Sequence, residues 1–327
     1  MKPVSFCISV LLLFAACKKE PTVPEDPPVP NVVWEQTNGP YGVFVNALAV
    51  SGTNIFAGTG GGVFLSTNNG LSWNAVNSGL TNLNVECLVV SGSNLFVVEP
   101  NGVFLTTDNG TSWVSLNNGL PPPSYWGGFN CLANSGTNLF LGYNTAFGIG
   151  GSGGLAGSVF LSTDSGMSWT EASTITYESR WVINVLVTSG TNLFAGTDFG
   201  VFLSTNNGSS WSAVNSGLTN LNVEVLVVSG TNLFAGTDSG GVFLSTNNGT
   251  SWTEVNSGLT NTAVVSFCPS GSNLFAGMAG SGVFLSTNNG MNWTKVGLDT
   301  LVVQALAVSG MNLFAGTNQG VFKGTMQ

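Results

Sequence analysis

The chain has 327 residues and a formal net charge of -9, and only 6% of its residues are charged. Nucleic-acid phosphates need clustered Lys and Arg, so this composition disfavours a nucleic-acid partner. No histidine occurs, which excludes histidine metal sites, Ser-His-Asp triads and Cys-His pairs. The 45 glycines, with abundant Asn, Ser and Thr, predict short strands joined by tight turns, without helices.

The N-terminal residues 1–16 are expected to be an export signal, because their apolar stretch is too short to span a bilayer. Phe14-Ala-Ala-Cys17 resembles the lipobox of bacterial lipoproteins, which implies that Cys17 becomes a lipidated first residue; a plain secretory signal is the alternative. The proline-rich residues 17–31 are predicted to be an extended tether. We expect an exported protein, held by lipid alone in the outer membrane of a bacterial envelope and facing either side.

The remaining residues, 32–327, contain a block of about 41 residues that recurs almost verbatim. Each copy ends in a form close to Ser-Thr-Asn-Asn-Gly-x-Ser-Trp. This length fits one four-stranded propeller blade, and the repetition predicts several such blades. The tryptophans that close the six complete copies are Trp73, Trp113, Trp169, Trp211, Trp252 and Trp293.

The first copy illustrates the four strands of a blade. Runs of β-compatible residues at 45–50, 55–59, 63–67 and 73–76 are separated by turn residues rich in Gly, Asn and Ser. The runs are apolar at successive positions, which is typical of sheets covered on both faces, as stacked blades are.

A seventh copy begins at Leu301 and stops without a tryptophan strand. The missing strand resembles residues 33–39, because Trp34 precedes Trp73 by 39 residues, which is one normal period. We therefore predict an all-β fold: a seven-bladed β-propeller of four-stranded antiparallel blades, whose last blade is closed by the N-terminal strand. Such closure removes exposed sheet edges.

The element that ends each copy resembles the Asp-box, or BNR repeat, of sialidases and other propellers. Its Asn or Asp oxygen can accept backbone N–H groups within the turn, its Gly permits positive φ, and its indole can seal neighbouring blades. Four of the six copies carry Asn, which favours a structural role over a Ca²⁺ site, so we predict neither a metal nor a cofactor. The acceptor residues are Asn68, Asp108, Asp164, Asn206, Asn247 and Asn288.

Three cysteines follow the tether. Cys87 and Cys131 occupy the repeat position of Ala47, a site for a small apolar side chain. We predict that these two and Cys268 are buried thiols without disulfides.

The propeller topology places the second-to-third loops and the interblade links on one face, called here the top face, and the other turns on the bottom face. Departures from the repeat concentrate on the top face at residues 121–128, 143–158 and 172–181. Aromatic residues and the sole Arg gather there, which favours a recognition patch; ordinary loop packing is the alternative. The patch comprises Tyr125, Trp126, Tyr143, Phe147, Tyr177, Glu178, Arg180 and Trp181.

A polar residue recurs near the start of each innermost strand, and we expect these residues near the upper mouth of the central channel. Glu86 and Glu224 belong to this set and could act as a general acid and base, as carboxylates do in glycoside hydrolases. Hydration of the ring is the alternative role. The set is Asn46, Glu86, Asn130, Asn184, Glu224 and Gln304, with Val265 as the exception.

The chain resembles three groups of propellers that carry Asp-boxes. Sialidases depend on an arginine triad, which the single arginine of this chain cannot supply. Residues 33–327 look more like the photosystem II assembly-factor propellers, which bind partner proteins, although the arginine-rich patch of that family is missing. Xyloglucanase-type propellers are also similar but pair two rings.

These resemblances imply a monomeric, noncatalytic scaffold that binds an envelope protein or glycan through its top face. One alternative is a glycan hydrolase or lyase that uses the channel-mouth carboxylates. Another is a multivalent lectin that uses the near-identical loops at residues 77–82, 215–220 and 256–261.

Overall fold

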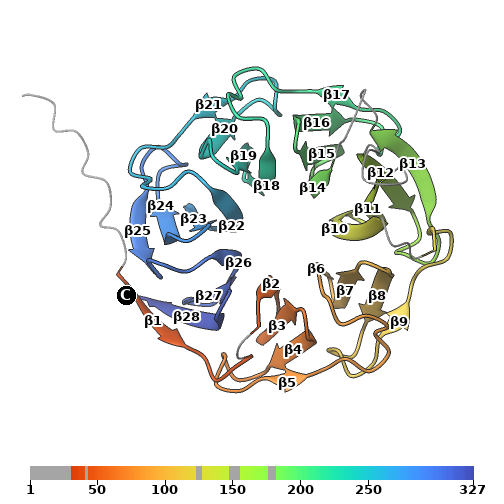
Figure 1. Cartoon of the computed structure of the whole chain (residues 1–327), viewed down its shortest axis with the longest axis horizontal. Helices are drawn as coiled ribbons and strands as arrows, with labels where there is room; N and C mark the ends of the chain where they lie inside the picture. The colour runs from red at the N-terminus through yellow and green to blue at the C-terminus, as the bar shows by residue number, and fades with distance from the viewer. Residues whose placement is uncertain (1–30, 41–42, 123–126, 147–154, 176–181) are drawn as a thin grey trace, which may run out of the picture.

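The computed structural model describes residues 31–40, 43–122, 127–146, 155–175 and 182–327. Within these ranges the chain forms 28 strands and no helix. The strands make seven four-stranded antiparallel sheets arranged as blades around a central axis (Figure 1). The predicted seven-bladed β-propeller is therefore confirmed. Blades 1 to 7 are numbered here by the chain order of their innermost strands.

The two inner strands of every blade lie nearest the axis (Figure 1). The innermost strands are β2 (Val45–Ser51), β6 (Cys87–Ser91), β10 (Gly127–Ser135), β14 (Ile183–Ser189), β18 (Val223–Ser229), β22 (Val264–Ser270) and β26 (Val303–Ser309). The second strands are β3 (Asn54–Thr59), β7 (Asn94–Glu99), β11 (Asn138–Ala146), β15 (Asn192–Thr197), β19 (Asn232–Thr237), β23 (Asn273–Met278) and β27 (Asn312–Thr317).

The two outer strands complete each blade, and most fourth strands are shorter than predicted because only two of their residues form ladder pairs. The third strands are β4 (Gly62–Ser66), β8 (Gly102–Thr106), β12 (Leu155–Ser162), β16 (Gly200–Ser204), β20 (Val242–Ser245), β24 (Gly282–Ser286) and β28 (Gly320–Met326). The fourth strands are β5 (Asn74–Ala75), β9 (Val114–Ser115), β13 (Thr170–Ile175), β17 (Ser212–Ala213), β21 (Thr253–Glu254), β25 (Thr294–Gly297) and β1 (Val32–Gln36).

The N-terminal strand closes the ring, as the tryptophan spacing predicts. β1 pairs antiparallel with β28, and Trp34 lies opposite Gly324. The pairing continues beyond the strand, since the Thr37 backbone N–H donates to the Val321 carbonyl at 3.0 Å. Blade 7 therefore contains both ends of the described chain.

A tryptophan from each blade donates its indole N–H to the preceding blade. Five of these bonds end on a backbone carbonyl, as from Trp252 to Val214 at 2.7 Å and from Trp34 to Val296 at 2.7 Å. The other two end on a hydroxyl, from Trp73 to Thr37 at 3.2 Å and from Trp211 to Ser173 at 3.0 Å. Trp34 thus acts as the seventh member of the set. The remaining donors are Trp113, Trp169 and Trp293.

Close approach between the inner strands depends on glycine in most second strands. A Cβ at Gly236 would lie 2.7 Å from Cγ1 of Val225 and 2.7 Å from Cγ1 of Val264, the latter in the next blade. The apolar core therefore consists of clusters that bridge neighbouring blades, such as the one that joins Phe194 to Val223 and Trp252.

The turn between the third and fourth strands, called here the box turn, has the same hydrogen bonds in each of its six copies. In blade 5 the buried Ser245 hydroxyl donates to Asn247 Oδ1 at 2.9 Å and accepts from the Gly249 backbone N–H at 2.8 Å. Asn247 Oδ1 also accepts from the Ser251 backbone N–H at 2.9 Å. Asn248 has φ 54°, so the turn uses the left-handed conformation that Asn tolerates.

Candidate functional site

The residues predicted to line the channel mouth lie at the upper ends of the innermost strands. In five of the blades concerned the residue occupies a register shift, as Asn46 does between Val45 and Ala47. A bulge of this kind leaves one residue outside the ladder and turns its side chain in a new direction. Glu86 differs slightly, because it precedes β6 and bonds through its backbone N–H to the Val98 carbonyl. The predicted residues at register shifts are Asn46, Asn130, Asn184, Glu224 and Gln304, and Val265 occupies the same shift in blade 6.

Three of these side chains bond to the next blade. Asn46 Nδ2 donates to the Val85 carbonyl at 3.0 Å, and Asn184 Nδ2 donates to the Val223 carbonyl at 3.0 Å. Asn130 makes the equivalent bond to Ile183. These amides therefore stabilise the boundaries between the inner strands, a role that the sequence interpretation did not include.

Glu86 and Glu224 place carboxylates where blades 1, 3 and 4 place amides that donate to the next blade. An ionised carboxylate has no proton to donate, so it cannot make the bond that Asn46 makes. Glu86 instead accepts from Asn84 Nδ2, and burial raises the pKa of its carboxyl. Burial also raises the pKa of Glu224, with a further contribution from the negative charge of Asp238. Both groups hold their protons more tightly than free glutamate does, as a general acid must.

Glu99 is a buried carboxylate that the sequence interpretation missed. Its side chain has no exposed surface, and burial raises the pKa of its carboxyl. Oε1 accepts from the Thr81 hydroxyl at 2.9 Å, whereas Oε2 makes no hydrogen bond with any described residue. The aligned repeats contain the signal, because Glu99 occupies the position of Thr59 and Thr197.

Blade 3 differs from the other blades on the top face. β11 and β12 have 9 and 8 residues, whereas β15 and β16 have 6 and 5. Their ladder continues through Tyr143, which pairs with Ser158, and on to the pair of Thr145 with Ala156. Tyr143 is half-buried and packs on Phe129 with ring centroids 4.8 Å apart. This hairpin therefore extends the top edge of blade 3 beyond the equivalent hairpins.

Tyr143 is the member of the predicted recognition patch that the structure describes. The other members lie outside the described residues, as do the predicted signal, the tether and Cys17. The members outside are Tyr125, Trp126, Phe147, Tyr177, Glu178, Arg180 and Trp181.

The top face also exposes large apolar side chains. Phe44, Leu83 and Leu221 lie on interblade links, and Phe199 lies on the loop between β15 and β16. These side chains are available to a partner, and the bottom face exposes apolar side chains of its own at Leu71, Met167, Met291 and Met311.

The near-identical link loops use their asparagines internally. Asn77 Oδ1 accepts from the Val63 backbone N–H at 2.7 Å, and Asn256 makes the equivalent bond to Val242 at 2.7 Å. At the other end of the loop, Asn220 Nδ2 donates to Asp238 Oδ1 at 3.0 Å. These contacts account for the conformation of the loops.

The three described cysteines are free thiols. Cys131 is buried, whereas Cys87 and Cys268 are partly buried. Burial raises the pKa of Cys87 and of Cys268 to about 11, so both stay protonated at neutral pH. Of the three, Cys131 has the burial class that the sequence predicts, whereas Cys87 and Cys268 keep some exposed surface.

Within the described part of the chain, no group of three or more Cys, Asp or Glu side chains is placed to hold a metal ion. The same part contains no helix with the length and apolar character needed to cross a bilayer.

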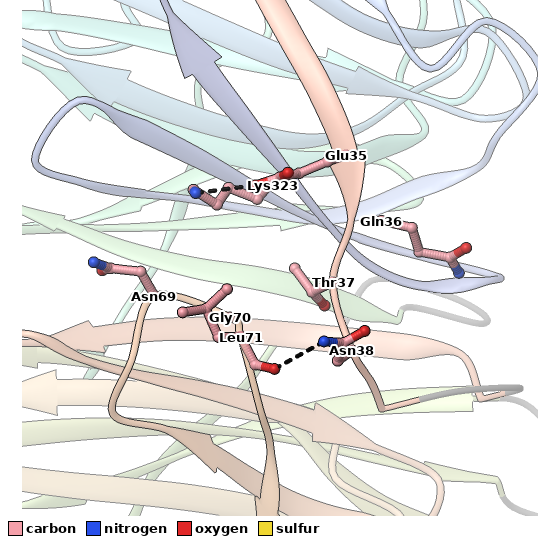
Figure 2. Close-up of a pocket in the computed structure, with 8 residues that line it drawn as sticks. All are labelled: Glu35, Gln36, Thr37, Asn38, Asn69, Gly70, Leu71 and Lys323. Carbon is pink, nitrogen blue, oxygen red and sulfur yellow. Dashed lines mark hydrogen bonds and ion pairs between the residues drawn. The ribbon is translucent and has the colours of Figure 1, made fainter.

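A cavity of about 230 Å³ lies where the ring closes, between β1 and the box turn of blade 1 (Figure 2). Lys323 Nζ donates to Glu35 Oε1 at 3.0 Å on one side. Asn38 Nδ2 donates to the Leu71 carbonyl at 3.1 Å on the other side. The cavity is thus lined by groups that already bond to each other across the closure.

Comparison with known proteins identifies the fold but no family. No family model and no curated protein matches the chain. The extracellular domain of BT4673, a one component system from B. thetaiotaomicron, matches 90% of the chain with a TM-score of 0.68 and 14% identity. The chain spans 39% of the length of that structure.

Two further structures match over a similar extent. YCF48 bound to D1 peptide has a TM-score of 0.68 and 14% identity, covering 92% of this chain and 98% of that one. An ancestral GH74 enzyme has a TM-score of 0.67 and 18% identity, covering 90% of this chain and 45% of that one. At these identities the matches show the propeller fold alone.

Proposed function

We propose that this chain is a noncatalytic scaffold of a bacterial cell envelope that binds a protein partner through its top face. The observation that carries the proposal is the extension of β11 and β12 in blade 3 beyond the same strands of the other blades. The exposed apolar residues of the top face, such as Leu83 and Phe199, support it. Apolar side chains beside an irregular rim can give a partner contact area and a unique orientation.

Two resemblances add support. The repeat ends in an element that resembles the Asp-box of propellers that bind other proteins, and YCF48, which has the same fold and nearly the same length, has been solved with a bound D1 peptide. We further propose that the chain is exported and is anchored in the outer membrane through a lipid on Cys17.

The binding proposal is tested by affinity capture from the native envelope. The double variant Leu83→Asp and Phe199→Asp puts charge on the top face, and Met167→Asp is the matched control on the bottom face. We expect the wild type and the control to retain the same proteins and the double variant to lose them. Retention by all three, with normal folding by circular dichroism, would contradict a top-face site.

The anchor is tested separately by fractionation. We expect the wild type in the membrane fraction and Cys17→Ala in the soluble fraction. If both partition equally, the lipid anchor is wrong, whereas the binding proposal is unaffected.

A second candidate is a glycan-active hydrolase, favoured by the raised pKa values of Glu86 and Glu224. A glycan array combined with a hydrolysis screen decides between the candidates. Turnover that is lost in Glu86→Gln supports the hydrolase, and retention without turnover supports a lectin. If the array shows no glycan binding and the screen shows no hydrolysis, the result supports the protein-binding scaffold.

A further inference from the structure

Both ends of the described chain lie on the bottom face at blade 7. The Gln327 backbone N–H donates to the Asn31 carbonyl at 2.9 Å, and Met326 N–H donates to the Met311 carbonyl at 3.3 Å. Met311 belongs to the turn between β26 and β27, which is a bottom-face turn. Asn31 stands three residues before Trp34, as Gly70 of a box turn stands before Trp73. The termini therefore occupy the place of a seventh box turn.

The bottom turns around this point expose large apolar side chains in three consecutive blades. The exposed fractions are 65% for Met291 in blade 6, 70% for Met311 in blade 7 and 65% for Leu71 in blade 1. Met311 departs from its repeat, because every equivalent turn carries a small hydroxyl residue. Those residues are Thr53, Ser93, Thr137, Thr191, Thr231 and Ser272.

The bottom turns of these three blades carry no carboxylate, because their box turns use Asn68 and Asn288. The described cations, Lys295 and Lys323, also belong to blades 6 and 7, and each forms an ion pair. The side chains of these turns are therefore uncharged, and those at the tips are apolar. The top face in contrast holds several carboxylates that reach solvent, namely Glu86, Asp198, Glu224 and Asp238.

We propose that the bottom face of blades 6, 7 and 1 rests on the lipid surface, with Leu71, Met291 and Met311 in contact with the bilayer interface. This inference rests on the lipid anchor of the proposed function. Residues 17–30 would span at most about 50 Å when fully extended, so the anchor keeps the propeller near the bilayer without fixing its orientation. Apolar side chains beside the attachment point supply that orientation, because they leave water at the interface.

The orientation has a consequence for binding. An anionic lipid surface repels carboxylates, so the acidic top face is disfavoured against the bilayer. With the bottom face on the membrane, Leu83 and Phe199 point away from it and stay accessible to a partner.

The test uses the full chain reconstituted in vesicles of phosphatidylethanolamine and phosphatidylglycerol, with a nitroxide label at one introduced cysteine. Met311→Cys reports on the bottom face and Leu83→Cys is the matched top-face control, since both replace exposed apolar residues. The unsubstituted chain measures labelling of the native thiols. We expect the label at 311 to collide mainly with oxygen, as in lipid, and the label at 83 to collide mainly with a water-soluble nickel chelate. An aqueous label at 311 would overturn the inference.

A second variant keeps the test independent of folding. Leu71→Thr, Met291→Thr and Met311→Thr together introduce a residue type found at equivalent turns, such as Thr111 and Thr53, so the fold is expected to persist. In this triple variant a label at Ser272→Cys should collide mainly with the water-soluble nickel chelate. In the chain that carries Ser272→Cys alone, the bilayer should shield the same label from the chelate. An unchanged signal would also overturn the inference.

Failure of the anchor and failure of the docking give different results. An anchored chain with an aqueous label at 311 leaves the anchor intact and rejects the docking. If the chain does not partition into membranes, an N-terminal hexahistidine bound to nickel-chelating lipid supplies the attachment, and the two labels are measured again. Spin–spin broadening between labels at 311 in the absence of lipid would identify a second copy of the chain as the occupant and would reject the bilayer.

Discussion

The two faces of the propeller are made by the same repeat but differ in regularity. The bottom face repeats one hydrogen-bonded box turn six times, and even the variable copies with Asp108 and Asp164 keep its geometry. The top face tolerates a longer hairpin in blade 3 and a glutamate at position 99 where Thr59 and its equivalents stand. A buried hydroxyl that must satisfy a backbone N–H constrains the bottom turns, whereas top loops of several lengths leave the ladders intact.

The largest loss of stability is expected from a substitution in a top-face interblade link. It tests whether the backbone of these links is as constrained as the backbone of the bottom turns. Gly217 has φ +92°, and an added Cβ would lie 2.2 Å from the Trp252 carbonyl oxygen. We expect Gly217→Ala to lower the free energy of unfolding by about 3 kcal/mol, because positive φ and a backbone clash add.

The matched control is Gly230→Ala in a bottom turn, where φ is +61° and nothing lies within 4 Å of the added Cβ. Only the conformational cost applies there, about 1 kcal/mol. Urea unfolding measures both variants. Equal losses of unfolding free energy in the two variants would show that the link backbone does not lie in close contact with Trp252.

The next effect concerns the box turn itself. Ser245→Ala removes the acceptor for the buried Gly249 N–H, and we expect a loss of about 2 kcal/mol. Ser251→Ala in the same turn removes a hydroxyl that accepts from Asn247 near the surface, and should cost less than about 0.5 kcal/mol. Thermal unfolding of the two variants separates them, and a reversed order would contradict the account of the bottom face.

Glu99→Thr introduces the residue found at this position in blades 1, 4, 5 and 7 and removes a buried carboxylate. Burial raises the pKa of Glu99, so the folded wild type loses stability as the pH rises from about 4.5 through that raised pKa. We expect the variant to be more stable than the wild type at pH 7 by about 1 kcal/mol, and the difference to shrink at pH 4. A difference that is constant with pH would show that the carboxylate is not the cause.

The smallest effect is expected for the double variant Asp108→Asn and Asp164→Asn. Hydrogen bonds from Thr106, and from the backbone and hydroxyl of Ser112, lower the pKa of Asp108 to about 2. The stabilising contribution of the ionised Asp108 is present above about pH 3.8 and is lost as the pH falls toward 2. The stability of the variant should therefore fall less steeply at acid pH than that of the wild type. At pH 7 its melting temperature should match that of the wild type, because Asn68 makes the same turn contacts. A clear loss at pH 7 would mean that the charge is needed.

The sequence contains enough to predict the blades and their closure. The tryptophan period locates every fourth strand, and Trp34 reveals the strand that completes blade 7. These features depend on local turn chemistry and on a repeat length, and both can be read from the amino-acid sequence alone.

The contacts between blades could not be predicted in the same way. The amide of Asn46 bonds to a carbonyl 39 residues away because a bulge redirects it, and bulges leave little trace in the pattern of apolar residues. The burial of Glu99 likewise depends on the neighbouring link at Thr81. The hydroxyl acceptors Thr37 and Ser173 replace backbone carbonyls at two blade boundaries, and only the structure identifies them.

The most direct test of the division between the faces is photo-crosslinking in living cells. The chain carries p-benzoylphenylalanine either at Phe199 on the top face or at Met167 on the bottom face, both exposed positions. The account predicts a discrete protein adduct from position 199 and none from position 167. The same adduct from both positions, or an adduct from position 167 alone, would contradict it.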